Sequence, residues 1–271
     1  MAIRSIGRYA LLVVCAVIVF LPIYVALVIA LQPAARIVDF PGVLLPRSLT
    51  LEPLRNAFRI GHLSRYLVNS MVVTAFIVAA QVTTSILAAY AFAFVQFPFK
   101  RVVFTLFLAT LMVPAEATIV ANYETIQHLH WLDTYQALIV PFTATAFGTF
   151  LLRQAFLGVP RDLRDASALD GAGHWGFLRH VAVPLARPAI AAFTVFSFLL
   201  AWNQYLWPLL VTNEDSHRTV QIGLKSLVGS NVATLNLPAA GALIAGAPIF
   251  LLLLFFQRHL VRGLTSGAVK G

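Results

Sequence analysis

The chain has 271 residues, of which 60% are hydrophobic and only 11% are charged, and its formal net charge is +9 at pH 7. Together with a mean hydropathy of +0.85, this composition excludes an ordinary soluble globular protein and a disordered chain. The basic surplus does not indicate nucleic-acid binding, because it lies at the ends of apolar runs and no basic domain stands apart from them.

The apolar residues fall into six runs of about 20 or more positions, the length that a helix needs to cross a bilayer. The runs lack the alternation of barrel strands, so we expect an all-α integral membrane protein with six transmembrane helices. The first run is too long for the apolar core of a signal peptide, and we keep it as a span. The predicted spans are Tyr9–Leu31, Leu67–Phe94, Val102–Tyr123, Ala137–Phe156, Ala189–Leu210 and Pro238–Gln257.

Lysine and arginine are distributed unevenly between the two sides of these spans. The side of the two termini carries twelve basic and three acidic residues, and the other side carries seven of each sign. The positive-inside rule therefore predicts that both termini are cytoplasmic, together with the loop 157–188 between spans four and five. The outer segment between spans one and two is expected to form one short helix near Leu51–Phe58, with Thr50 as its cap.

The cytoplasmic loop 157–188 is too long for a simple hairpin connection. Pro160 can begin a helix there, Asp162 lies in its first turn, and Gly171 can end it. One narrow face carries mostly small side chains that let a soluble partner approach the helix backbone. The alternative is an amphipathic helix that lies on lipid headgroups. The residues of the face are Leu163, Ala166, Ser167 and Asp170.

The same loop resembles the EAA loop of the permeases of binding-protein-dependent ABC importers. Asp165 stands where the family usually has Glu, and Ser167 where it usually has Ala. Two further runs, Leu111–Pro114 and Val261–Gly271, look like the carbohydrate (maltose-permease-like) branch, and Trp202–Pro208 most resembles glycerol-3-phosphate permeases. The matching loop residues are Asp165-Ala166-Ser167, Asp170-Gly171-Ala172, Phe177, Val183-Pro184-Leu185 and Pro188.

The resemblance implies a single transmembrane permease domain over 1–271 that forms half of a translocation pathway. It implies a second homologous permease subunit, two ATPase subunits that bind ATP and Mg, and an extracytoplasmic solute-binding protein as partners. The chain itself would then hold no cofactor or metal and perform no catalysis, and the solute would be a sugar, glycerol 3-phosphate or a glycerophosphodiester. The residues implied to seat on the ATPase are Leu163, Asp165, Ala166, Ser167, Asp170 and Gly171.

Polar residues at membrane depth are candidates for a substrate pathway. Glu116 and Asn203 each lie 14 residues beyond the cytoplasmic start of their predicted span, hence at a similar depth of roughly 21 Å. For the aromatic residues, an aromatic belt at the outer interface is the alternative. The pathway candidates are Glu116, Trp202, Asn203, Gln204 and Tyr205.

The remaining polar residues of the spans suit structural roles. Within the second span we expect Gln81, Thr83, Thr84 and Tyr90 to form hydrogen bonds between helices. We expect no lysine or arginine inside a span that could neutralise a phosphate. Two other functions stay open at this point: a lipid-modifying membrane enzyme, although the seven histidines do not cluster, and a secondary transporter, although no inverted repeat is visible.

Overall fold

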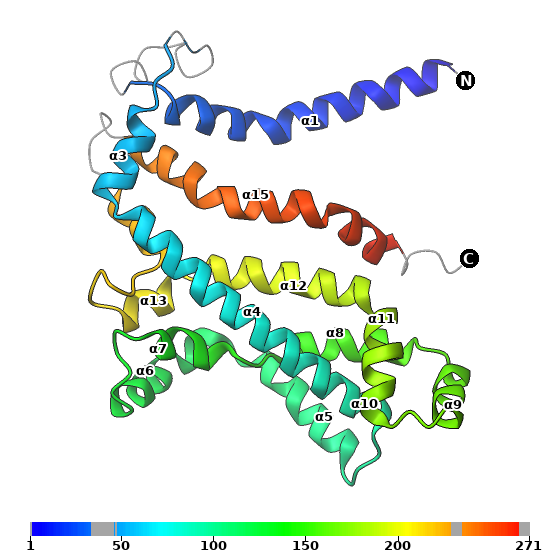
Figure 1. Cartoon of the computed structure of the whole chain (residues 1–271). Coiled ribbons are helices and arrows are strands. Elements are labelled where there is room, and N and C mark those ends of the chain that lie inside the picture. The colour runs from blue at the N-terminus through cyan, green and yellow to red at the C-terminus, as the bar shows by residue number, and fades with distance from the viewer. Residues whose placement is uncertain (1, 34–45, 47, 229–234, 266–271) are drawn as a thin grey trace. The chain divides into compact units, whose positions relative to one another are not determined.

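The structure is a computed structural model of the chain, and it describes residues 2–33, 46, 48–228 and 235–265. Every regular element within these residues is a helix, which confirms the predicted all-α class. The chain divides into two compact units, Met1–Leu67 with Thr219–Pro248 and Val68–Arg218 with Ile249–Gly271. Figure 1 traces the helices of both units along the chain.

The first unit contains the N-terminal helix, whose surface shows which solvent it is built for. Its large apolar side chains are exposed along most of its length, with Leu11 and Phe20 both at 64%. Such a surface fits lipid rather than water. The helices of this unit are α1 (Ala2–Ala30), α3 (Glu52–Ile60), the first turn of α4 (Leu63–Phe94), α14 (Val220–Ser226) and the first part of α15 (Asn236–Thr265).

The short helix predicted in the outer segment exists as α3, but its cap differs from the prediction. The helix begins at Glu52, and its N-cap is Leu51 rather than Thr50. Thr50 still contributes, because its hydroxyl accepts a hydrogen bond from the Glu52 N–H at 3.2 Å. Pro53 in the first turn, where an N–H would have no helical partner, explains why the helix starts here.

The second unit holds most of the chain and all the residues that we predicted to have functional roles. Among the described residues it comprises the rest of α4 and of α15 together with nine complete α-helices and four short 3₁₀ or π segments. In chain order these are α5 (Lys100–Ala109), η1 (Thr110–Met112), η2 (Ala115–Thr118), α6 (Ile119–His128), α7 (Tyr135–Ile139), η3 (Val140–Phe142), α8 (Ala146–Leu157), α9 (Arg161–Leu169), α10 (His174–Phe177), the π-helix η4 (Leu178–Ala182), α11 (Val183–Leu185), α12 (Arg187–Trp202) and α13 (Leu206–Val211).

Three described helices are long and apolar enough to cross a bilayer alone, and they correspond to predicted spans one, two and six. Predicted spans three and four are bent pairs instead, and predicted span five, Ala189–Leu210, coincides only in part with a third bent pair. The described residues therefore offer three spans, or up to six if each pair counts as one. The pairs are Lys100–Met112 with Glu116–His128 (90°), Tyr135–Phe142 with Ala146–Leu157 (43°) and His174–Leu185 with Arg187–Trp202 (77°).

Two prolines explain why the predicted continuous spans three and five are interrupted. Proline lacks an N–H and its ring clashes with the carbonyl four residues earlier, so Pro114 ends the helix that includes η1. Val113 before it is extended, with ψ of 115°, as expected for a residue that precedes proline. Pro208 acts in the same way on Gln204, and α12 therefore ends at Trp202 instead of continuing to Leu210.

Close packing in the second unit centres on Gly148 of α8. A Cβ atom at this position would lie 2.2 Å from the Phe193 ring of α12 and 2.5 Å from the Ser85 hydroxyl of α4. Only glycine therefore allows these three helices to meet. Beside this contact, Leu152, Phe156 and Phe193 are almost fully buried in an apolar cluster.

The polar residues of α4 largely do what the sequence predicts. Gln81 joins three helical segments, because its amide donates to the Phe142 carbonyl at 2.8 Å and accepts from the Ser197 hydroxyl at 2.6 Å. Thr84 likewise reaches the Thr143 carbonyl at 3.0 Å. The prediction is wrong for Thr83, whose hydroxyl bonds back to Ala79 in its own helix.

The expectation that no cation lies within the spans is also wrong. Arg153 is part of α8 and is only partly exposed, and its Nε donates to the Phe92 carbonyl at 3.1 Å. A guanidinium can be held at this depth because it satisfies a carbonyl at the C-terminal end of α4.

Candidate functional site

The helix predicted in the loop 157–188 is present as α9, and its C-terminal end has the geometry that the sequence predicts. Gly171 has φ of +75°, a conformation that glycine adopts without a steric cost. The Ala172 N–H donates to Ser167 O at 2.9 Å and the Gly171 N–H to Ala168 O at 3.1 Å. These two bonds form a Schellman motif, which fixes where the helix stops and where the chain turns.

The surface of α9 is exposed almost all round in this chain. The described side chains on the predicted narrow face are exposed, except Ser167, which is half-buried, and Asp165 beside the face is exposed as well. Figure 1 shows α9 joined by loops to α8 and α10 and standing clear of them. A short helix with so little burial gains little stability from its own chain, so it suits contact with another molecule.

Sequence reasoning missed the two most exposed apolar side chains of this loop. Leu169 in the last turn of α9 is 90% exposed, and Trp175 at the start of α10 is 68% exposed. Large apolar side chains of this kind on a polar loop indicate a protein or membrane contact. Their apolar character in a charged segment was the available signal, but Leu169 falls outside the small-residue face on which the prediction rested.

Aromatic packing fastens the base of the loop to the end of α4. Phe177 is 4% exposed and its ring meets Phe94 edge-on, with 5.1 Å between ring centroids. The Tyr90 hydroxyl lies 2.9 Å from His174 Nδ1, a contact whose donor depends on the histidine tautomer. The helix α10, which follows α9 in the chain, is therefore packed against the last turns of α4.

A hollow of about 400 Å³ lies between the start of α9 and the ends of α4 and α8. Arg164 and Asp165 line one side of it, and Phe94 and Phe156 line the other. The Arg164 guanidinium lies 5.9 Å from the centre of the Phe94 ring, at the outer limit of a cation–π contact. The first turn of α9 is thus in only loose contact with the rest of the chain.

The candidate pathway residues around the end of α12 have different environments. Trp202 is 2% exposed and stacks on Phe198, with a centroid distance of 5.5 Å and an interplanar angle of 11°. Asn203 is exposed and its side-chain amide caps α12 by donating to Leu199 O at 2.8 Å. Gln204 and Tyr205 are half-buried.

Gln204 has one unusual feature among these residues. Its Oε1 atom is buried and accepts no hydrogen bond within the described part of the chain. Burying an acceptor without a donor is costly, so this oxygen is the least satisfied polar atom among the candidate pathway residues. Trp207, by contrast, satisfies its N–H on the Ala137 carbonyl at 2.9 Å and packs in the core.

The depth argument for Glu116 is wrong, because it counted residues along a straight helix. Glu116 follows the bend at Pro114 and lies in η2, where its side chain is exposed. The inference that Glu116 and Asn203 lie at a similar depth therefore no longer holds, and the place of Glu116 in a pathway stays a prediction.

Residues 81–266 match the family of binding-protein-dependent transport system inner membrane components. The chain belongs to this family. It is therefore a multi-pass permease subunit of a transport system and not an enzyme, which confirms the resemblance predicted from the loop. The alternatives of a lipid-modifying enzyme and a secondary transporter are thereby set aside.

Full-length relatives agree with this membership. The sn-glycerol-3-phosphate transport system permease protein UgpE of Brucella abortus (strain 2308) is 36% identical over 267 residues, which cover 95% of each chain. The protein of the same name from Rhizobium meliloti (strain 1021) is 35% identical over 273 residues, or 97% of each chain. That from Yersinia pestis bv. Antiqua (strain Antiqua) is 33% identical over 266 residues, or 95% of each.

Solved structures share the fold. A chain of a bacterial ABC transporter involved in the import of the acidic polysaccharide alginate aligns with a TM-score of 0.84 at 20% identity, covering 96% of this chain and 97% of that one. A chain of the bacterial alginate ABC transporter in complex with an alginate pentasaccharide-bound periplasmic protein aligns with a TM-score of 0.60 at 16% identity, covering 93% of each.

Proposed function

We propose that the chain is one of two homologous permease subunits of an ATP-driven importer for glycerol 3-phosphate or a related glycerophosphodiester. The observation that carries the proposal is the 36% identity, over 95% of each chain, to a protein named as an sn-glycerol-3-phosphate transport permease. The whole chain then acts as one permease domain with six spans, in which each bent helix pair is a single broken span. Both termini and the loop 157–188 are cytoplasmic.

In this proposal α9 is the coupling helix, and two ATPase subunits that bind ATP and Mg supply the energy. The support is physical: α9 is exposed, carries the apolar Leu169 at 90% exposure, and is followed by α10, whose Phe177 packs against Phe94 of α4. Closure of the ATPases would push on α9 and shift α4 relative to its neighbours. An alternating-access cycle needs such an element that biases one of two arrangements.

The solute enters from an extracytoplasmic binding protein and passes the end of α12. Asn203 and Gln204 offer amide groups for its hydroxyls there, with Tyr205, Trp202 and Glu116 as the other candidate contacts. None of these five residues is cationic, so the phosphate charge would be neutralised by the second permease subunit, a histidine or the arginines of the outer segments.

The test is uptake by the complete transporter in proteoliposomes, with ATP inside and the binding protein outside. We expect ATP-dependent uptake of labelled sn-glycerol 3-phosphate and little uptake of glycerol or maltose under the same conditions. ATP-dependent uptake of an uncharged sugar alone would contradict the proposed solute but leave the permease role intact. Uptake of glycerol 3-phosphate without ATP would contradict the coupling.

A further inference from the structure

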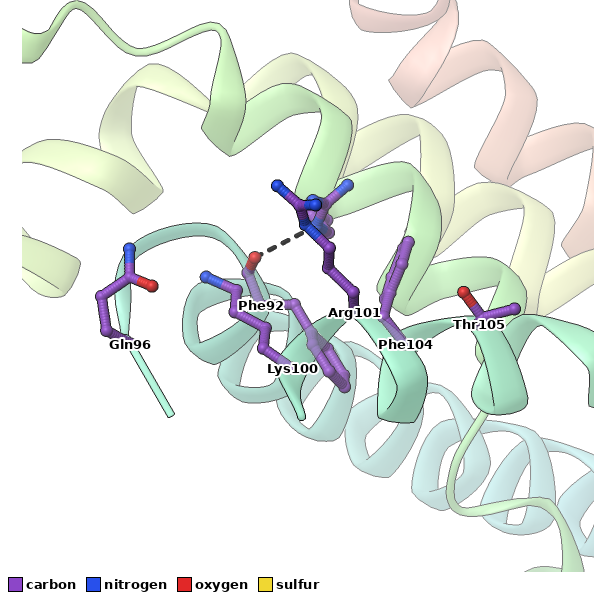
Figure 2. Close-up of a pocket in the computed structure, with 7 residues that line it drawn as sticks. Phe92, Gln96, Lys100, Arg101, Phe104 and Thr105 are labelled. Carbon is purple, nitrogen blue, oxygen red and sulfur yellow. Dashed lines mark hydrogen bonds between the residues drawn. The ribbon is translucent and has the colours of Figure 1, made fainter. Parts of the chain in front are cut away.

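A pocket of about 440 Å³ lies at the turn between α4 and α5, and none of its lining residues belongs to α9 or to the end of α12. Three of its lining residues are cations, two are polar and two are aromatic, and none is a carboxylate. Figure 2 shows the side chains around the pocket. The lining residues are Phe92, Gln96, Lys100, Arg101, Phe104, Thr105 and Arg153.

The helical repeat brings four of these side chains to one side of α5. Residues four apart are neighbours on a helix surface, so Lys100 lies beside Phe104 and Arg101 beside Thr105. Figure 2 shows these four side chains on the first turns of α5. Arg153 reaches the same place from α8.

Two of the cations, Lys100 and Arg153, already donate hydrogen bonds to backbone carbonyls of this chain. Lys100 Nζ donates to the Val95 carbonyl at 2.8 Å, and Arg153 Nε donates to the Phe92 carbonyl at 3.1 Å. Both bonds satisfy carbonyls at the C-terminal end of α4, which carry a partial negative charge. The Arg153 guanidinium also lies over the Phe104 ring, 4.3 Å from its centre, and this cation–π contact helps to fix its position.

This role leaves a surplus of positive charge and of donors. A helix C-terminus is equivalent to only about half of an elementary negative charge, whereas three cations line the pocket. Arg101 makes no hydrogen bond or ion pair in the described part of the chain, and Arg153 commits only Nε, so its two terminal nitrogens can still donate. A fixed guanidinium fork beside a second arginine and a hydroxyl, here Thr105, is the arrangement that binds a phosphate.

The surroundings indicate where the phosphate comes from. On the same helix, Val102, Val103 and Leu106 are 55%, 44% and 64% exposed, so the pocket opens beside an apolar surface of a candidate span. Basic pockets at the ends of membrane helices bind the headgroups of anionic lipids. We propose that this pocket binds the phosphate of an anionic phospholipid, whose acyl chains lie along the exposed apolar face of α5.

The test measures how tightly the purified complete transporter, in detergent, binds a fluorescent short-chain phosphatidylglycerol, with phosphatidylcholine as the zwitterionic comparison. Arg101→Gln is the main test variant, because the Arg101 side chain makes no hydrogen bond in the described part of the chain and its loss should not disturb the fold. We expect it to weaken phosphatidylglycerol binding about fivefold and to leave phosphatidylcholine unchanged. Arg187→Gln, which removes an exposed arginine at the start of α12, is the matched control and should have no effect.

Arg153→Gln should weaken binding further, and its thermal stability is measured in parallel because it also removes a cap of α4. Equal binding of phosphatidylglycerol by wild type and Arg101→Gln would overturn the proposal. Displacement of the lipid by an equal concentration of inorganic phosphate would overturn the lipid assignment and would mean that the pocket binds a soluble phosphate. No solute uptake is measured, so failure here leaves the proposed transport function untouched.

Discussion

The carboxylate of Asp133 accepts a hydrogen bond from the backbone N–H of Glu214 at 2.8 Å. It accepts two more from the backbone and the side chain of Asn213, and the Asp133 N–H donates in return to Val211 O at 2.9 Å. These four hydrogen bonds, which we call the Asp133 clasp, hold the turn before α7 against the segment after α13. Burial raises the pKa of Asp133, but the hydrogen bonds from Glu214 and Asn213, with His217 nearby, outweigh burial and lower the pKa below its usual value of 3.8.

The clasp should make stability depend on pH at the acid end. A carboxyl group with a lower pKa in the folded state stabilises the fold fully above its unfolded pKa, and this contribution is lost as the pH falls through the folded value. We expect Asp133→Ala to unfold at a lower temperature than wild type at neutral pH, with a difference that shrinks below pH 3.8. A difference that stays constant across this range would show that the charge of Asp133 is irrelevant.

Gly148 should be intolerant of even one added methyl group. In Gly148→Ala the new Cβ would overlap the Phe193 ring and the Ser85 hydroxyl, and overpacking of this kind costs about 1–3 kcal/mol. We expect a clear fall in the thermal unfolding temperature of the purified transporter. Gly173→Ala is the control, because its Cβ would meet nothing within 4 Å. Equal stability of the two variants would mean that α8 can move away at no cost.

Gly171 should matter for coupling rather than for insertion. Valine there would have to adopt φ of +75°, which costs roughly 1–2 kcal/mol and reduces the population of correctly turned loop by about 5- to 30-fold. We expect Gly171→Val to lose ATP-driven uptake severalfold while the protein still inserts. Gly173→Val is the matched control, because Gly173 has φ of −70° and open space around it. Unchanged uptake in Gly171→Val would remove this turn from the coupling path.

Asn203 and Gln204 should affect transport without affecting assembly. The buried Oε1 of Gln204 has no donor in the described part of the chain, so Gln204→Leu removes an acceptor that the fold itself does not use. We expect Gln204→Leu and Asn203→Leu to lower the rate of solute uptake severalfold, while the ATPase subunits co-purify as in wild type. Unaltered uptake kinetics would exclude both residues from the pathway.

Much of the fold could be predicted because bilayer thickness imposes a length on apolar helices. The first, second and last spans are continuous helices for this reason. The breaks in spans three and five were missed, because Pro114 and Pro208 lie in runs that are long and apolar enough overall to pass as one continuous span. The relevant signal was the proline itself, which the length criterion ignores.

The loop prediction succeeded where backbone chemistry decides the outcome. Gly171 ends α9 because the turn after the helix needs a residue in the left-handed backbone conformation, with positive φ. Leu169, Trp175 and the clasp of Asp133 were missed, since exposure and contacts between residues distant in the chain depend on how the helices pack. Arg153 could have been noticed in the sequence, because it lies within the predicted span Ala137–Phe156; only its partner, the Phe92 carbonyl on another helix, could not be predicted.

Cross-linking from position 169 tests most directly whether α9 receives energy from an ATPase. The variant Leu169→Cys, in a chain whose single cysteine is replaced by Cys15→Ser, carries one thiol on a side chain that is 90% exposed in wild type. We predict that a short bifunctional reagent joins this thiol to the ATPase subunit of the complete transporter and that ATP changes the yield. Labelling of Leu169→Cys only by lipid-soluble reagents, with no ATPase attached, would contradict the account.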